Sequence, residues 1–200
     1  VYLAAAALSV RTVSDYGGFG LGDFLKNIQN GWPAGLILGG AILALAAMAW
    51  IIIPFYIELK SMTGLLLAAV IFWTLTLTML SIQWFFAIRA RLDSKPVKII
   101  KKCFIIFFDN SGFSLFCFLH NAVLLVISAL TAFLIPGPAG ILLYLDEALR
   151  LRLLKYDWLE ANPGETAVRR RTIPWDAILI EEREKTGTRS LRSFIFPWKD

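Results

Sequence analysis

The stretch from Gly35 to Ile53 reads GLILGGAILALAAMAWIII and contains no charged side chain. It lies inside a longer uncharged segment, 27–57, and two further segments without Asp, Glu, Lys or Arg follow at 61–88 and 110–145. Each segment exceeds the roughly 20 apolar residues that cross a bilayer as a helix. The sequence therefore predicts an all-α integral membrane protein, built as a helical bundle.

The composition of the whole chain agrees with a membrane environment. Of its 200 residues, 58% are hydrophobic, and the mean hydropathy is +0.66, whereas soluble domains are about 45–50% apolar. The net charge of +5 is carried outside the apolar segments. These values exclude a disordered chain, a disulfide scaffold and a soluble nucleic-acid-binding protein, and they favour a multi-pass protein of a bacterial inner (plasma) membrane.

We expect a membrane domain over residues 1–155 and a cytoplasmic C-terminal tail over 156–200. The chain begins at Val1, and its first ten residues are too few to span a bilayer, so we expect it to start inside a longer protein. The membrane domain is predicted to contain four spans and two interfacial amphipathic helices. The predicted spans are about 33–56, 64–87, 113–135 and 139–156, and the interfacial helices are about 23–32 and 95–108.

The orientation follows from the loop between the second and third spans. Residues 89–109 hold six basic and two acidic side chains, so the positive-inside rule places this loop in the cytoplasm. The fourth span contains Asp146, Glu147, Arg150 and Arg152, and it is expected to cross because three consecutive arginines at 169–171 would otherwise lie outside. Asp146 and Arg150, at i and i+4, are placed to pair toward the bundle interior.

The first interfacial helix is expected to begin with Asp23 as its N-cap. Small residues of the following span, Gly35, Gly39 and Gly40, would let a neighbouring helix approach closely. Trp84, Phe85 and Phe86 end the second span where an aromatic belt is expected.

The second interfacial helix is expected to start at Ser94 or Pro96 and to carry an apolar side and a basic flank. We predict that the basic flank contacts anionic lipid or a protein partner. The apolar residues are Val97, Ile100, Phe104, Phe107 and Phe108, and the basic residues are Lys95, Lys98, Lys101 and Lys102.

Four polar side chains within the predicted spans are candidates for function, because intramembrane polar groups are costly. They are Gln83, His120, Asp146 and Arg150. We interpret His120 as a hydrogen-bonding partner of a neighbouring helix. The alternative is a role in ligand binding or proton transfer. The charged group around Asp146 is interpreted as part of a helix that emerges into the cytoplasm, with an ion or substrate site as the alternative.

Motifs for catalysis are missing from the sequence. It contains no P-loop, no HExxH zinc motif, no CxxC pair and no GxSxG elbow. We therefore expect no enzyme activity, no cofactor and no metal. Cys103 and Cys117 lie in a basic loop and an apolar span, so we expect packing roles rather than a disulfide.

The order of these features resembles the YesL-like family of small bacterial membrane proteins. The resemblance covers residues 1–156 and is carried by three short stretches, FGLGDFLKN at 19–27, FAIRARLD at 86–93 and LRLLKY at 151–156. That family has no assigned activity, and its members are associated with carbohydrate importers of the ABC class and their sensor kinases. The resemblance implies a further span before the region that matches the first ten residues.

The tail beyond residue 156 departs from the shorter members of that family. We expect a helix from Pro174 to Glu184 and an aromatic end that contacts a partner or lipid through Phe194, Phe196 and Trp198. The leading hypothesis is a non-enzymatic accessory or regulatory subunit that binds a carbohydrate ABC importer or its sensor kinase. The alternatives are a small stand-alone transporter or channel, and a scaffold that organises lipid or other proteins.

Overall fold

The computed structural model describes residues 1–18, 20–162, 173–180 and 184. These residues contain helices and turns and no strand, which confirms the predicted all-α class. The chain divides into two compact units, Val1–Leu149 and Arg150–Asp200. The first unit holds α1 to α6 and the first half of α7, and we describe it first.

Helices α1 (Tyr2–Ser14) and α2 (Leu21–Glu58) pack closely against each other because their contact surfaces are small. A Cβ atom at Gly31 would lie 3.1 Å from the Ala4 carbonyl carbon, and one at Gly35 would lie 3.0 Å from Val1 Cα. Ala4 and Ala5 are 1% and 0% exposed. The predicted close approach of a helix is therefore confirmed at Gly35, where the neighbour is α1, but not at Gly39 or Gly40, where a Cβ atom would meet nothing within 4 Å.

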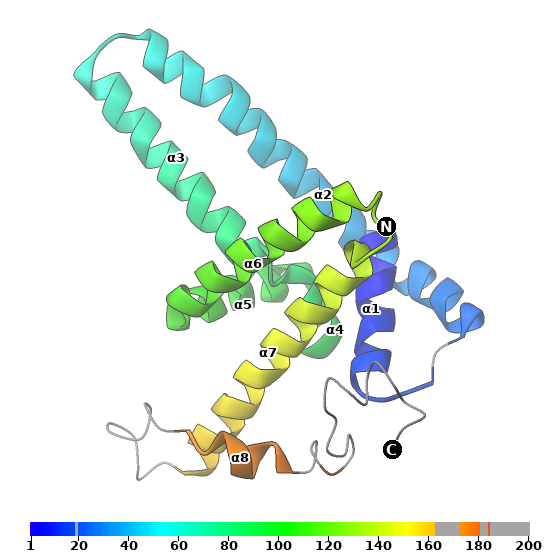
Figure 1. Cartoon of the computed structure of the whole chain (residues 1–200). Coiled ribbons are helices and arrows are strands. Elements are labelled where there is room, and N and C mark those ends of the chain that lie inside the picture. The colour runs from blue at the N-terminus through cyan, green and yellow to red at the C-terminus, as the bar shows by residue number, and fades with distance from the viewer. Residues whose placement is uncertain (19, 163–172, 181–183, 185–200) are drawn as a thin grey trace. The chain divides into compact units, whose positions relative to one another are not determined.

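Helix α2 continues through the position where the sequence analysis separates an interfacial helix from the first span. Pro33 lies inside α2, and Figure 1 draws the segment as one ribbon. A proline within a membrane helix is tolerated where neighbouring groups satisfy the freed backbone. The start also differs from the prediction, because Gly20 is the N-cap and its N–H donates to Asp23 Oδ2 at 3.2 Å.

The predicted hairpin of two spans is formed by α2 and α3 (Met62–Ile82). Its short turn is fixed by the Ser61 hydroxyl, which accepts a hydrogen bond from the Gly64 N–H at 3.1 Å. A Cβ atom at Gly64 would lie 2.5 Å from the Tyr56 carbonyl oxygen, so only glycine fits this position.

The core of the first unit lies at the end of the hairpin opposite this turn. Helix α4 (Phe85–Arg91) is its most deeply buried element, with Phe85 1% and Ile88 0% exposed, and Trp84 just before it is also 0% exposed. Trp84 and Phe85 therefore belong to the core, whereas the sequence analysis placed them in an aromatic belt. Helix α4 packs against α1 and α5.

Helix α5 (Pro96–Asp109) confirms a helix at the predicted position, with Pro96 in its first turn. Its buried side differs from the predicted one. The structure buries Ile99, Cys103, Ile106 and Phe107, whereas Val97 and Phe108 of the predicted apolar side are 80% and 63% exposed. The helix thus carries an inner apolar stripe on the bundle and an outer apolar stripe that remains open.

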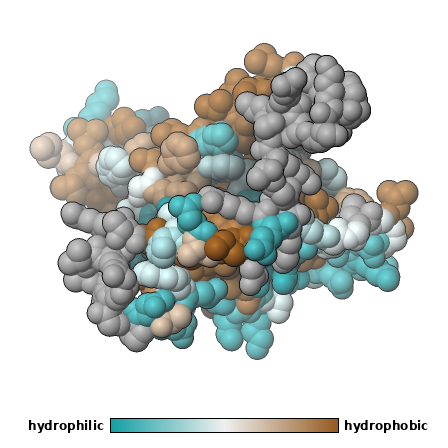
Figure 2. Space-filling view, turned by 60° about the horizontal axis from the view of Figure 1, so that its bottom comes forward, coloured by the Kyte–Doolittle hydropathy of each residue, from teal (hydrophilic) through white to brown (hydrophobic). Residues whose placement is uncertain are grey.

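Three helices are long and apolar enough to cross a membrane among the described residues: α2, the segment Met62–Arg91 that joins α3 and α4, and α6 (Ser111–Leu130). Helix α7 (Gly137–Ala161), the predicted fourth span, does not meet the same criterion because charged residues interrupt it. In Figure 2 hydrophobic residues form continuous brown areas, as expected for surface that faces lipid or protein.

The second unit contains the end of α7 and the short helix α8 (Trp175–Ile178), with Pro174 as its N-cap. This agrees with the predicted start near Pro174, and most of the predicted continuation toward Glu184 lies outside the described residues. The unit boundary, after Leu149, precedes the predicted domain boundary at residue 155.

Candidate functional site

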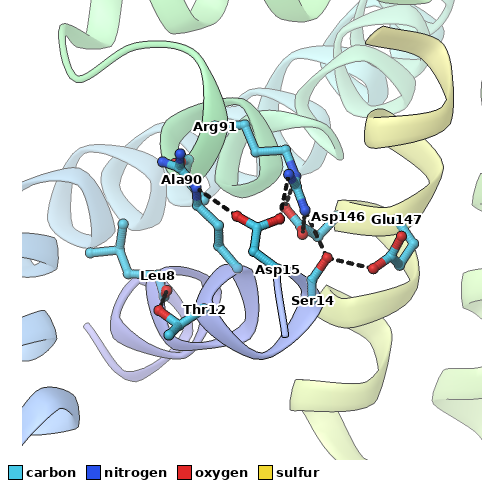
Figure 3. Close-up of polar contacts among 9 residues, drawn as sticks. Leu8, Thr12, Ser14, Asp15, Ala90, Arg91, Asp146 and Glu147 are labelled. Atoms are coloured by element: carbon cyan, nitrogen blue, oxygen red, sulfur yellow. Dashed lines mark hydrogen bonds and ion pairs between the residues drawn. The ribbon is translucent and has the colours of Figure 1, made fainter. Parts of the chain in front are cut away.

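The strongest concentration of charge in the first unit joins α1, α4 and α7. We call it the polar cluster, and Figure 3 shows its contacts. Its members are Arg11, Ser14, Asp15, Arg91, Asp146 and Glu147.

Arg91 is the centre of the polar cluster. Its Nε donates to Asp146 Oδ1 at 2.9 Å and its Nη2 to Asp146 Oδ2 at 2.5 Å, a bidentate pair. Its Nη1 donates to Asp15 Oδ1 at 3.1 Å, and its Nη2 also donates to the Ser14 hydroxyl at 2.7 Å. The Arg91 side chain is 10% exposed and that of Asp146 is 2% exposed. The pair is therefore largely removed from water.

Two further bonds complete the link between the three helices. The Ser14 hydroxyl donates to Glu147 Oε1, and Arg11 Nη1 donates to the backbone carbonyl of Ala90. Arg11 also forms an ion pair with Asp15 at 3.6 Å. The last turn of α1, the end of α4 and the middle of α7 are thus held by one hydrogen-bonded network.

The arrangement of the polar cluster suits a structural clamp between helices. A bidentate Arg–carboxylate pair has a fixed geometry, and breaking a buried pair leaves an uncompensated charge. The two guanidinium groups are held by carboxylates and carbonyl or hydroxyl oxygens of the same cluster. The cluster therefore positions α7 against α1 and α4.

The structure changes the predicted role of Asp146. Its partner is Arg91, from a helix far away in the sequence, whereas the sequence analysis paired it with Arg150. Arg150 is the first residue of the second unit. Asp146 is 1% exposed, which agrees with its predicted orientation toward the bundle interior, and the interpretation of its helix as one that emerges into the cytoplasm stays a prediction.

His120 contacts aromatic rings of α6 and α7. Its ring centroid lies 4.4 Å from that of Tyr144 and 6.2 Å from that of Phe116. The Tyr144 hydroxyl donates to Cys117 Sγ at 3.5 Å, so three side chains of α6 and one of α7 meet here. The rings of His120 and Tyr144 thus join α6 to α7, and the predicted hydrogen bond of His120 stays a prediction.

Gln83 belongs to the second candidate span, Met62–Arg91, and contacts the third. Its Nε2 donates to the backbone carbonyls of Leu80 at 2.8 Å and Ser114 at 2.9 Å. The neighbouring Trp84 Nε1–H donates to the Ser114 hydroxyl at 3.1 Å. These bonds attach the end of α3 to the start of α6. The Gln83 Oε1 atom is buried and has no hydrogen-bond partner among the described residues.

The four lysines predicted to contact lipid or a partner lie at or on α5. Lys95 is its N-cap, and Lys95, Lys98 and Lys101 are exposed. Lys102 forms an ion pair with Asp93 at 3.5 Å. The Lys95 N–H donates to Asp93 Oδ1, and this bond, together with Lys102, holds the pKa of the Asp93 carboxyl below its ordinary value.

The two cysteines are free thiols with 1% and 0% exposure. Burial raises the pKa of the Cys103 thiol to about 12, so it is protonated at neutral pH. The predicted aromatic contacts Phe194, Phe196 and Trp198 lie outside the described residues. Within the described part of the chain, no group of three or more His, Cys, Asp or Glu side chains could hold a metal ion.

Sequence reasoning missed the roles of Arg91 and Ser14. Arg91 lies in the stretch 86–93 that carries the family resemblance, so its position in a distinctive segment was the available signal. The sequence contains no signal for the role of Ser14, because a serine near a helix end has many ordinary roles. The chain matches no family model, no curated protein and no solved structure.

Proposed function

We propose that the protein is a non-enzymatic accessory or regulatory membrane subunit that binds a carbohydrate importer of the ABC class or its sensor kinase. An importer is proposed as the partner because the sequence resembles the YesL-like family. The structural support is the amount of apolar surface that the chain leaves open.

The observation that carries the proposal is the low burial of the candidate spans. Within the chain, 6% of the most apolar stretch of α2, 11% of that of Met62–Arg91 and 17% of that of α6 are buried. Helices that associate in a membrane use van der Waals packing between such surfaces. A chain with a tight core at one end and open spans has much surface left for the helices of another membrane protein.

Helix α5 supplies the second element of the proposal. At 100° per residue, Val97, Ile100, Phe104 and Phe108 lie within one quarter of the helix circumference, next to the inner stripe. We call these four residues the outer stripe. The exposed lysines Lys98 and Lys101 lie on its other flank. Exposed aromatic and aliphatic side chains beside charges are typical of protein contact sites.

The alternative function is a small stand-alone transporter or channel. The observation that favours it is the polar side of α6, where the buried Asn121 Oδ1 and Ser128 Oγ atoms have no hydrogen-bond partner among the described residues. Several hydroxyls of α3 give no support, because they donate to carbonyls of their own helix. These are Thr74, Thr76, Thr78 and Ser81.

Purification of the full-length protein from its own membranes in mild detergent, followed by mass spectrometry, tests the proposal. We expect an importer permease or sensor kinase in stoichiometric amounts. Replacing Val97 and Phe108 together by serine should reduce its recovery about tenfold, since contact energy is concentrated in few side chains. Ile105→Ser is the matched control, because Ile105 lies on α5 outside the outer stripe and is 55% exposed.

Recovery of the protein without any importer component contradicts the proposal. Liposome flux that His120→Ala or Asn121→Ala abolishes would then favour the transporter. Equal recovery of the partner by the parent protein and the outer-stripe variant would leave the accessory role but remove α5 from the contact.

A further inference from the structure

An apolar groove of about 590 Å³ runs along one side of the α2–α3 hairpin. On α2 its lining runs from Leu38 to Ile53 and includes Ala46 and Ala49, and on the other side it runs from Phe72 to Phe86, with Phe118 of α6. A rise of 1.5 Å per residue makes the groove about 20 Å long. Thr76 and Gln83 are its polar lining residues, so its wall is almost entirely hydrocarbon.

One helical turn beyond Phe86 stands Arg89. Its Nη2 donates to the backbone carbonyl of Asn30 at 2.9 Å, and its Nε is buried without a hydrogen-bond partner among the described residues. No carboxylate of the described chain forms an ion pair with it, whereas Arg11 has one such partner and Arg91 has two. A partly buried guanidinium without an anion is costly. The positive charge of Arg89, beyond Phe86 at this end of the groove, therefore favours binding of an anionic group from outside the chain.

We propose that the groove and Arg89 together form a binding site for an anionic phospholipid, with one acyl chain in the groove and the phosphate at the guanidinium. An acyl chain is one methylene wide and half a bilayer core is about 15 Å thick, so the groove is long enough to hold it. Arginine matches phosphate in geometry and charge.

The charge of Arg89 favours a lipid over a transmembrane helix of a partner, because the lipid phosphate supplies the anion that no described carboxylate supplies. The lipid site lies apart from the outer stripe of α5, and a bound lipid would cover part of the open surface of α2 and α3.

Native mass spectrometry of the full-length protein in detergent, titrated with phosphatidylglycerol or with phosphatidylcholine of the same chains, tests the site. We expect phosphatidylglycerol to bind at least about tenfold more tightly, because the phosphatidylcholine headgroup is zwitterionic. Arg89→Gln should reduce this preference about tenfold, the usual size of a charge-assisted hydrogen bond. Lys60→Gln, which removes the same charge at the hairpin turn, should leave it unchanged.

A second pair of variants tests the groove. Ala49→Phe fills it and should weaken the binding of both lipids, while Ala47→Phe places the same bulk on the opposite side of α2 and should have no effect. This pair decides the question even if Arg89→Gln fails to fold. Equal binding of both lipids by the parent protein, or unchanged binding by Ala49→Phe, overturns the proposal. A crosslink from position 49 to another protein in native membranes also overturns it.

Discussion

Arg91 holds Asp146 by two hydrogen bonds, of 2.9 Å from Nε to Oδ1 and 2.5 Å from Nη2 to Oδ2, across 55 residues of sequence. Both side chains are largely buried. The pair therefore fixes α7 to the end of α4.

Asp146→Asn is therefore expected to lower the free energy of unfolding by roughly 3 kcal/mol, since removing one partner leaves a buried charge. Thermal unfolding in detergent measures the change. Asp15→Asn is the control, because Asp15 is 43% exposed and should contribute less than about 1 kcal/mol. The double variant Arg91→Met, Asp146→Leu should recover most of the loss. Equal stability of Asp146→Asn and the parent protein would remove the clamp from the account.

The contact between α1 and α2 predicts a position-specific effect of size. Gly31→Leu should destabilise the protein by about 1–3 kcal/mol, because its side chain meets the backbone of Ala4 and Ala5. Gly39→Leu should be nearly neutral, since a Cβ atom there meets nothing within 4 Å. Thermal unfolding of both variants under the same conditions compares them. Similar losses for the two would show that the contact with α1 does not set the cost.

Burial of the thiols predicts slow chemical modification. In the folded protein Cys103 and Cys117 should react with a maleimide far more slowly than free cysteine, because neither is accessible and Cys103 is protonated at neutral pH. Both should react after denaturation in SDS, as counted by mass spectrometry. Rapid labelling of either thiol in the folded protein would contradict the described packing of α5 and α6.

Asp93 predicts a pH dependence at the start of α5. Its pKa is lowered from the ordinary value of 3.8, so its contribution to stability is present above that value and is lost as the pH falls through the lowered pKa. Asp93→Asn should therefore be less stable than the parent protein at neutral pH. The difference should vanish at acidic pH below 3.8, as followed by thermal unfolding. A difference independent of pH would assign the effect to something other than the carboxylate.

The sequence predicted what depends on local pattern. The apolar segment around Gly35 and the helix beginning near Pro96 follow from hydropathy and from a proline. The buried side of α5 was wrong because both its sides are apolar, and burial is decided by which helix packs there. Trp84 was placed in an aromatic belt for the same reason, because hydropathy does not show that other helices pack around it and bury it in the core. The pairing of Asp146 with Arg91 joins distant helices, so no local spacing could reveal it.

We propose that the chain is a membrane protein whose basic loop, residues 89–109, lies in the cytoplasm. Reporter fusions at Lys98, Gly137 and Glu182 in the full-length protein test it most directly. We expect a cytoplasmic signal at Lys98 and Glu182 and an external signal at Gly137. Opposite signals at Gly137 and Glu182 would also establish that the chain crosses the membrane between them. An external signal at Lys98, or the same side for Gly137 and Lys98, would contradict it.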